Sequence, residues 1–274
     1  MMKTIIKTII KTGVVLIMGL LSLTISAQKS EQELVVPLSN PGRPGTLEVS
    51  ILYGSISVTG TSAKDVIIHV STEQKKVENT SKNGLRKIPN NSFGLRAEED
   101  DNNVKVSTDL SNKNVNLDIK VPQNFNLKLR AVNDGDISVE NISGEIDINH
   151  VNGDITSTNV SGSVIANTTN GDVKVAFNSI TPDTPMSFTS FNGDVDVTLP
   201  ANIKASAKMR SDMGEIYTDF DMTMKNNSSP KEEKDVKAGV YKVSIEKWMY
   251  GDINGGGPEM TFKSFNGDII IRSK

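Results

Sequence analysis

Apolar and polar positions alternate within units of nine residues along the middle of the chain. Each unit begins with a glycine, and aliphatic residues tend to follow it at the second, fourth and seventh positions, as with Ile137, Val139 and Ile142. This alternation is the period of a half-buried strand, and glycine supplies the positive φ angle that a tight corner requires. Each unit is therefore predicted to form one short strand and one corner. The corner glycines are Gly135, Gly144, Gly153, Gly162 and Gly171.

The corners alternate between two types. Asp-Gly-Asp or Asn-Gly-Asp recurs every 18 residues, at 134–136, 152–154 and 170–172, and Ser-Gly lies between them at 143–144 and 161–162. A chain wound with this repeat stacks one corner type along each edge. We therefore expect an all-β chain, wound as a right-handed two-sided β-solenoid or a stacked β-sandwich-like coil in which each turn buries its aliphatic residues against the next. An antiparallel meander is the alternative, because Asn-Gly also favours hairpins.

Less regular strand patterns lie on both sides of the repeat. Corner-plus-strand units return at 191–197 and 265–271, with Gly193 and Gly267 at their corners. The polar stretches 73–103 and 223–238 are predicted to be loops. Because no linker separates these parts, we expect one domain over 28–274, with an irregular strand-rich part at 28–130 and the repeat part at 131–274. Upstream strands are predicted at 33–38, 46–52, 55–59, 65–72, 104–109, 114–121 and 125–131.

The N-terminus has the composition of a secretory signal peptide. Three lysines, Lys3, Lys7 and Lys11, precede an almost wholly apolar run at 14–23, and small residues lead to Ala27. This pattern predicts a signal peptide over 1–27 that is removed after Ala27. An uncleaved anchor helix is the alternative, but the apolar run is shorter than the roughly 20 residues that span a bilayer. We therefore expect an exported protein without a transmembrane segment after signal removal, in the periplasm, at the cell surface or in the medium.

Composition narrows the chemistry. The 274 residues include no cysteine, which excludes disulfides, cysteine-ligated metals and a thiol nucleophile. Removing the three lysines of the signal leaves 27 basic and 33 acidic side chains, a net charge of about −6. A general nucleic-acid partner needs a basic face, so we expect none.

The repeat and its surroundings resemble a known family. The corners carry this resemblance together with four stretches: 121–129, 194–200, 211–220 and 255–269. In their order and spacing they resemble the DUF4097 adhesins of bacteria, closely over Val121–Lys274 and loosely over the strands before it. The resemblance implies an exported, β-solenoid-like protein with an adhesin role and provides no catalytic residue.

The corners also form a column of carboxylates. If equivalent corners stack at strand spacing, successive carboxylates lie about 4.8 Å apart, and such a column could gather a hard cation such as calcium through its oxygens. Asp and Asn are equally expected there because they suit tight corners, and the Gly-Gly-x-Gly-x-Asp pattern of calcium-binding nonapeptides is missing. We favour the structural role and expect neither a metal nor a cofactor. The column comprises Asp136, Asp154 and Asp172, extended by Asp194 and Asp268.

The sequence contains no catalytic signature. There is no Gly-x-Ser-x-Gly elbow and no His-Glu-x-x-His motif. The two histidines, His69 and His150, are therefore interpreted as strand-surface residues. Aromatic residues of the last third are interpreted as a cap on the end of the solenoid, with a sugar- or peptide-stacking surface as the alternative. They are Tyr217, Phe220, Trp248, Tyr250, Phe262 and Phe265.

These observations predict a non-catalytic adhesin or scaffold of the bacterial envelope with a glycan or a protein as partner. One alternative is a carbohydrate-active enzyme, a lyase or hydrolase, on a wound β scaffold. A lyase would use a basic residue against acidic sugars, and Lys174 is the only Lys or Arg between 134 and 175. Another alternative is a periplasmic stress or signalling component.

Overall fold

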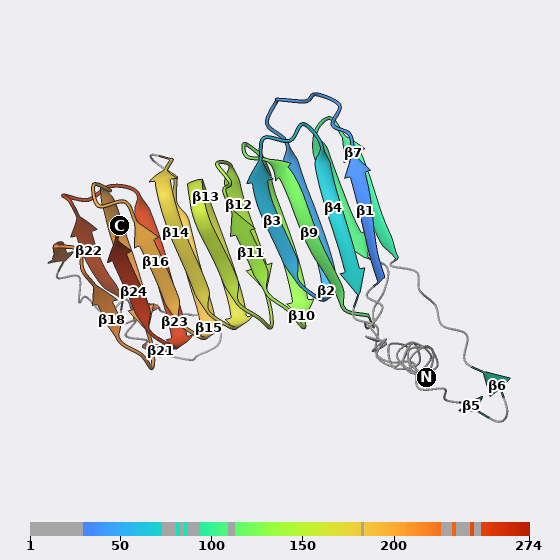
Figure 1. Cartoon of the computed structure of the whole chain (residues 1–274). Coiled ribbons are helices and arrows are strands. Elements are labelled where there is room, and N and C mark those ends of the chain that lie inside the picture. Colours follow the sequence, from blue (N-terminus) through green and yellow to red (C-terminus); the bar gives the residue numbers. More distant parts are fainter. Residues whose placement is uncertain are drawn as a thin grey trace, which may run out of the picture.

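The computed structural model describes residues 30–72, 81–82, 85–86, 94–108, 113–181, 184–225, 232–233, 242–243 and 248–274. The predicted signal peptide lies outside these ranges. Within them no residue is helical, and almost all strands join one 20-stranded sheet folded into two facing layers (Figure 1). The remaining strands form two small hairpin pairs, β5 (Ser81–Lys82) with β6 (Leu85–Arg86) and β20 (Glu232–Glu233) with β21 (Lys242–Val243).

We name the two layers sheet A and sheet B. Sheet A runs, in spatial order, through β1 (Ser30–Val36), β4 (Val66–Thr72), β9 (Val115–Pro122), β3 (Ile56–Thr61), β11 (Ile137–Glu140), the first part of β13 (Ile155–Asn170), β14 (Val173–Ile180), β16 (Val195–Leu199), β24 (Ile269–Ser273) and β18 (Ile216–Thr218). Sheet B runs through β7 (Leu95–Asp100), β8 (Asn103–Thr108), β2 (Thr46–Tyr53), β10 (Asn126–Asn133), β12 (Glu145–His150), the second part of β13, β15 (Met186–Asn192), β23 (Glu259–Asn266), β17 (Ala205–Ser211), β22 (Met249–Ile253) and β19 (Met222–Lys225).

The central strands wind as parallel coils. Ile137 lies opposite Ile155, and Ile155 lies opposite Val173, so residues 18 apart are direct neighbours. Each coil crosses sheet B, turns at an Asn-Gly-Asp-type corner and returns through sheet A. The predicted two-sided solenoid is confirmed, and the antiparallel meander is excluded for these coils.

One coil near each end of the solenoid is out of sequence order. The C-terminal coil, β23 and β24, lies between the β15–β16 coil and the β17–β18 coil, and it pairs in parallel with both. Near the other end, β2 and β3 lie between β8–β9 and β10–β11. The chain therefore does not finish at the end of the stack, and both sides of its last strands are paired rather than left as open edges.

Antiparallel strands complete both ends. β1, β4 and β7 do so at one end, and β22 and β19 at the other. Two of these strands lie where the sequence predicted polar loops. β7 falls within the stretch 73–103, and β19 overlaps the start of the stretch 223–238. That prediction was wrong for β7, where the inward residues Leu95 and Ala97 alternate with exposed charged residues that dominate the composition.

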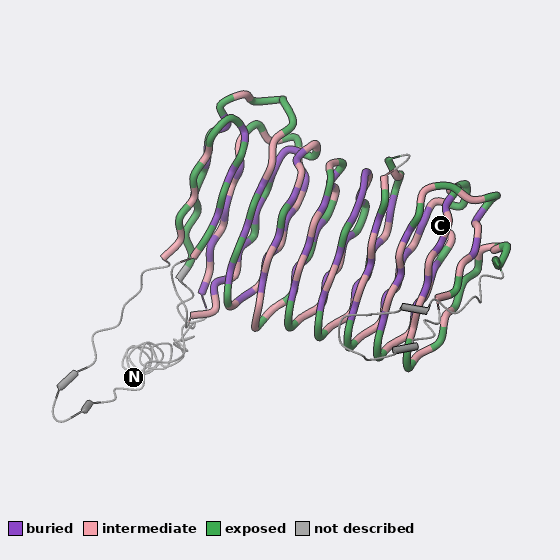
Figure 2. The backbone as a smooth tube through the Cα atoms, turned by 180° about the vertical axis from the view of Figure 1, so that it is seen from behind, coloured by how far each residue is buried: buried purple, intermediate pink, exposed green. Residues whose placement is uncertain are grey.

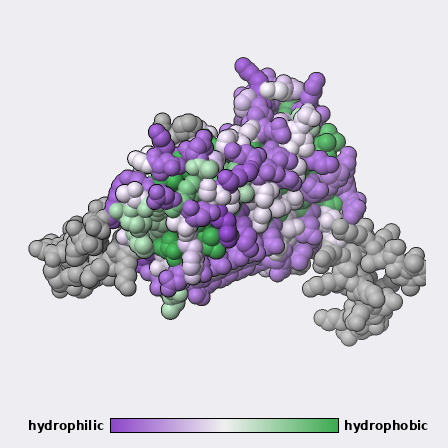
Figure 3. All heavy atoms as spheres, turned by 60° about the vertical axis from the view of Figure 1, so that its left-hand side comes forward, coloured by the Kyte–Doolittle hydropathy of each residue, from purple (hydrophilic) through white to green (hydrophobic). Residues whose placement is uncertain are grey.

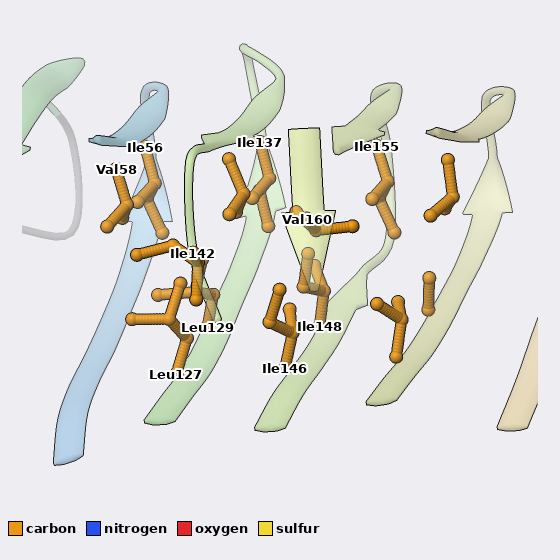
Figure 4. Packing of buried hydrophobic residues seen from close by; sticks show 14 of the residues in the cluster. Ile56, Val58, Leu127, Leu129, Ile137, Ile142, Ile146, Ile148, Ile155 and Val160 are labelled. Carbon is orange, nitrogen blue, oxygen red and sulfur yellow. The ribbon is translucent and has the colours of Figure 1, made fainter. Parts of the chain in front are cut away.

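The core consists of aliphatic columns between the sheets. Figure 4 shows Ile137 and Ile155 of sheet A extending toward Leu127 and Ile146 of sheet B. Buried residues alternate with less buried ones along the strands, while the corners are mostly exposed or of intermediate burial (Figure 2). Small aliphatic residues suit this arrangement because each coil must present the same width to its neighbours.

Two of the buried polar side chains have polar atoms without a hydrogen-bond partner. His150 is 4% exposed, and neither of its ring nitrogens has a hydrogen-bond partner. The interpretation of His150 as a surface residue was wrong, because it has the same strand parity as the buried Ile146 and Ile148. Ser157 is also fully buried, and its hydroxyl lacks a partner where the neighbouring coils have Val139 and Val175.

Candidate functional site

The corner that follows each sheet B strand carries an asparagine ladder. The Asn152 side-chain amide donates to Oδ1 of Asn133 over 2.7 Å, and Asn170 donates to Asn152 over the same distance. Asn192 continues the ladder to Asn170 at 2.8 Å. These amides hold successive coils in register, which is a structural use of the Asn-Gly-Asp motif.

The predicted carboxylates form a second ladder on the same edge. The backbone N–H of Asp154 donates to Oδ1 of Asp136 over 2.9 Å, and the N–H of Asp172 donates to Asp154 over 2.8 Å. The same bond joins Asp194 to Asp172 and Asp268 to Asp194. All five candidate acids therefore lie in one column, and four of them accept a backbone amide from another of the five.

The last carboxylate of the column also has a backbone partner. The N–H of Glu215, in the β17–β18 coil, donates to Oδ1 of Asp268 over 2.9 Å. Among the residues that the structure describes, no group of three or more acids and histidines is arranged to hold a metal ion. The geometry thus gives these acids a function in coil stacking.

Small hydroxyl groups form a third ladder just inside this edge. The hydroxyl of Thr168 donates to the Gly153 carbonyl over 3.0 Å, and Ser190 and Ser264 donate in the same way to Gly171 and Gly193. In the preceding coil this position is held by His150. The sequence analysis did not predict this ladder. The signal that could have indicated it is a serine or threonine two residues before the corner asparagine, as in the coils of Asn170, Asn192 and Asn266.

Asp172 is the column member whose ionisation is most clearly coupled to the fold. Partial burial raises the pKa of the Asp172 carboxyl, but the hydrogen bond from the Asp194 amide and the ammonium of Lys174, 2.9 Å from Oδ2, together outweigh burial. The pKa of Asp172 therefore lies below its ordinary value. A carboxylate of this kind stabilises the fold above its unfolded-state pKa of about 3.9, and the contribution is lost as the pH falls through the folded-state pKa.

We therefore expect Asp172→Asn to flatten the acid dependence of stability. The free energy of unfolding of the parent should fall as the pH is lowered below about 4, and the variant should fall less steeply over that range. Urea denaturation at a series of pH values measures both slopes. Asp134→Asn is the control, because the Asp134 carboxylate makes no hydrogen bond or ion pair within the described part of the chain. Equal slopes for parent and Asp172→Asn would contradict the prediction.

A polar hollow on the outer face of sheet A contains the other histidine. The hollow has a volume of about 620 Å³, and Glu33, His69 and Asp118 lie in register across its floor. His69 Nδ1 is 3.4 Å from Glu33 Oε2. His69 is partly exposed, which agrees with its interpretation as a strand-surface residue. Ser57 lies opposite Asp118 and is therefore separated from His69 by one strand. Among the described residues, no serine hydroxyl forms the hydrogen bond to His69 that a serine nucleophile would require.

A neighbouring hollow of about 600 Å³ extends this polar face. The two hollows share Ser55, Ser57 and Asn116. The Ser55 hydroxyl donates to Oδ1 of Asn116 over 3.0 Å, which links the two side chains. Together the hollows present hydroxyl, amide, carboxylate and imidazole groups.

The aromatic residues of the last third are divided between core and surface. Phe262 is fully buried and stacks on Phe188, with ring centroids 5.3 Å apart. Phe265 is 39% exposed and stacks on Phe191. Of the predicted cap residues, Phe220 packs partly buried against the core, whereas Tyr217 is exposed. The cap interpretation was therefore wrong for Phe262 and Phe265. In Figure 3 hydrophobic residues gather on the surface toward the C-terminal coils.

Comparison with known proteins identifies the family. A family model described as Toastrack DUF4097 matches residues 22–254. The chain belongs to this family. The match includes the N-terminal strands, which the sequence motifs resembled only loosely, and it ends at 254, before the out-of-order C-terminal coil.

Several solved structures align with this Toastrack chain at low sequence identity. A "putative cell adhesion protein" from Clostridium sporogenes is 13% identical, with 90% of this chain and 100% of that chain covered and a TM-score of 0.47. A "putative adhesin" from Bacteroides fragilis is 11% identical, with 91% and 98% covered and a TM-score of 0.33. A "putative lipid binding protein" from Parabacteroides distasonis is 9% identical, with 90% and 96% covered and a TM-score of 0.31. A search of curated proteins finds no match to the chain.

Within the described part of the chain, no helix is long and apolar enough to cross a bilayer.

Proposed function

We propose that this Toastrack chain is an exported, non-catalytic adhesin or scaffold of the bacterial envelope that presents its outer sheet faces to a glycan or a protein. The observation that carries the proposal is the regularity of those faces. Ser57, Ser138 and Thr156 lie in register across sheet A, and Asn167 and Thr189 do so across sheet B. Such rows repeat at strand spacing of about 4.8 Å and offer hydrogen bonds to an extended ligand.

The corner chemistry supports the same conclusion. The corner acids Asp136, Asp154, Asp172, Asp194 and Asp268 each accept a backbone amide from a neighbouring coil. These acids therefore stabilise the stack, which leaves the outer faces as the surfaces available for recognition. The predicted signal peptide over 1–27 supports the proposed export.

A carbohydrate-active enzyme is the second candidate, and one observation favours it. His69 lies between Glu33 and Asp118 in a hollow large enough for a sugar unit. A histidine between two carboxylates can act in proton transfer. This candidate makes a different prediction from the first, because it requires product release that depends on His69.

The experiment is a comparison of binding with turnover. The mature chain is incubated with a panel of envelope and capsular polysaccharides, and both retention on the polymer and released products are measured. We expect binding without product, unchanged in His69→Ala. Product release that disappears in His69→Ala would replace the proposed function with the enzymatic one. Cell fractionation completes the test, because a chain confined to the cytoplasm would contradict an envelope role.

A further inference from the structure

Two phenylalanines lie exposed side by side on the outer face of sheet B. Phe191 is 50% exposed and Phe265 is 39% exposed. Their ring centroids are 4.7 Å apart and their planes differ by 1°. In β15 the inward residues are Met186, Phe188 and Ser190, so Phe191 has outward parity. An exposed aromatic pair of this kind is typical of a contact surface.

Cations occupy the outward rows next to this pair. Thr189 lies opposite Lys263 and Lys263 lies opposite Arg210, while Thr261 lies opposite Lys208. Three positive side chains therefore project from two adjacent strands, β23 and β17. The corresponding rows contain no carboxylate from Ile165 to Lys208 or from Asn167 to Arg210. These two rows are positive on a chain whose net charge is negative, and the carboxylates of Glu259 and Asp212 border them.

Two further aromatic residues border the cations. The ammonium of Lys208 lies 4.8 Å from the centroid of the Trp248 ring, and the guanidinium carbon of Arg210 lies 5.9 Å from it. Tyr250 is opposite Lys208 on β22. We call Phe191, Phe265, Lys263, Arg210, Lys208 and Trp248 together the aromatic–cation surface.

The cations of this surface differ in how they are neutralised. Arg210 pairs with Asp212 at 2.9 Å, and both side chains are about three-quarters buried. Lys208 has a long contact of 3.8 Å with Glu259. Lys263 forms no ion pair or hydrogen bond with any described residue. Arg210 therefore contributes mainly to the architecture, while Lys263 offers its charge to a ligand and Lys208 is only weakly neutralised.

We propose that the aromatic–cation surface binds an acidic polysaccharide, an inference that rests on the proposed binding function and specifies its ligand. A charge-assisted hydrogen bond joins each uronate carboxylate to Lys263 or Lys208. The apolar faces of sugar rings pack on Phe191, Phe265 and the indole of Trp248. The hydroxyl of Thr189, in the same row as Lys263, bonds to sugar hydroxyls.

The chemistry favours an acidic glycan over a nucleic acid. Nucleic-acid binding depends on neutralising many closely spaced phosphates, and here three cations stand on a chain with an excess of acidic residues. A glycan with one carboxylate per sugar matches sparse cations interleaved with rings and hydroxyls.

The direct test uses polygalacturonate and its fully methyl-esterified form as probes. The two polymers share sugar rings and linkage, and only the first is charged. We expect the mature chain to bind polygalacturonate at least about tenfold more tightly than the ester, and we expect this affinity to fall as salt screens exposed charges. Isothermal titration calorimetry measures both affinities.

Variants assign the binding to the surface. Lys263→Glu is expected to weaken polygalacturonate binding about tenfold, and the double variant Phe191→Ser, Phe265→Ser by a similar factor. The control is Lys120→Glu on the exposed face of β9 in sheet A, which should leave the affinity within about twofold. Far-UV circular dichroism and urea unfolding establish that each variant is folded.

Three outcomes would overturn the inference. They are equal affinity for the ester, an undiminished affinity in Lys263→Glu, or tighter binding of oligothymidine or phosphatidylglycerol vesicles through the same residues. Failure of the inference remains distinguishable from failure of the proposed function. A chain that binds another envelope glycan or protein independently of Lys263 loses only the inference, whereas product release contradicts the proposed function itself.

Discussion

Gly171→Ala is expected to lower the free energy of unfolding by about 4 kcal/mol, the sum of backbone strain and overpacking. Gly171 has a φ angle of +149°, a conformation that a residue with a Cβ atom rarely adopts. A Cβ atom at this position would also collide with the carbonyl group of Gly153 in the preceding coil. Because that carbonyl belongs to the stacked backbone, it cannot move aside without separating two coils. Urea denaturation followed by far-UV circular dichroism measures the loss.

Gly255→Ala is the matched control for this prediction. Gly255 also has a positive φ angle, +87°, but a Cβ atom there would meet no atom within 4 Å. The substitution should therefore cost only the backbone strain, about 1 kcal/mol. If both substitutions destabilised the protein equally, the close approach of successive corners would not be the reason for glycine at 171.

The coil architecture was predictable because its sequence signal is local. A nine-residue unit contains its own strand alternation and its own corner glycine, and two kinds of corner define a coil of 18 residues. The stacking of Asp136, Asp154 and Asp172 follows from that period alone. Parallel pairing of Ile137 with Ile155 shows that the inference from period to register was correct.

Because the sequence signal is local, the order in which the coils stack was not predictable. A corner-plus-strand unit has similar residues wherever it is placed, so Gly267 indicates that a coil exists but not which coils it contacts. The structure inserts this coil between those of Gly193 and Gly214, which are closer together in sequence. Pairing of both sides of the terminal strands is a property of the whole stack, and no local pattern indicates it.

The aromatic–cation surface was missed because it depends on that insertion. Arg210 and Lys263 are 53 residues apart, and they become neighbours only because β23 pairs in parallel with β17. Strand parity, in contrast, was available in the sequence. Ile146, Ile148 and His150 alternate with outward residues, which was the signal that His150 points into the core.

Phe188→Ala is expected to cost about 3–5 kcal/mol of folding stability, the usual range for truncating a buried phenylalanine. Phe188 is fully buried and lies between two other rings: its centroid is 5.3 Å from that of Phe262 and 6.2 Å from that of Phe177. Truncation leaves a cavity between the sheets, because neighbouring coils held by corner ladders cannot collapse to fill it. Chemical denaturation measures the change.

Phe191→Ala, at a position three residues further along β15, distinguishes the role of the inner pair, Phe188 and Phe262, from that of the outer pair, Phe191 and Phe265. Phe191 also stacks on a phenylalanine of β23, but it is half exposed and truncating it opens no cavity. Its loss should cost no more than about 1.5 kcal/mol, the upper value for an aromatic pair beyond area burial. The inner pair would then stabilise the fold, and the outer pair would remain available for a ligand. A loss as large as that of Phe188→Ala would show that the outer pair is structural, and it would remove the aromatic part of the argument for glycan binding.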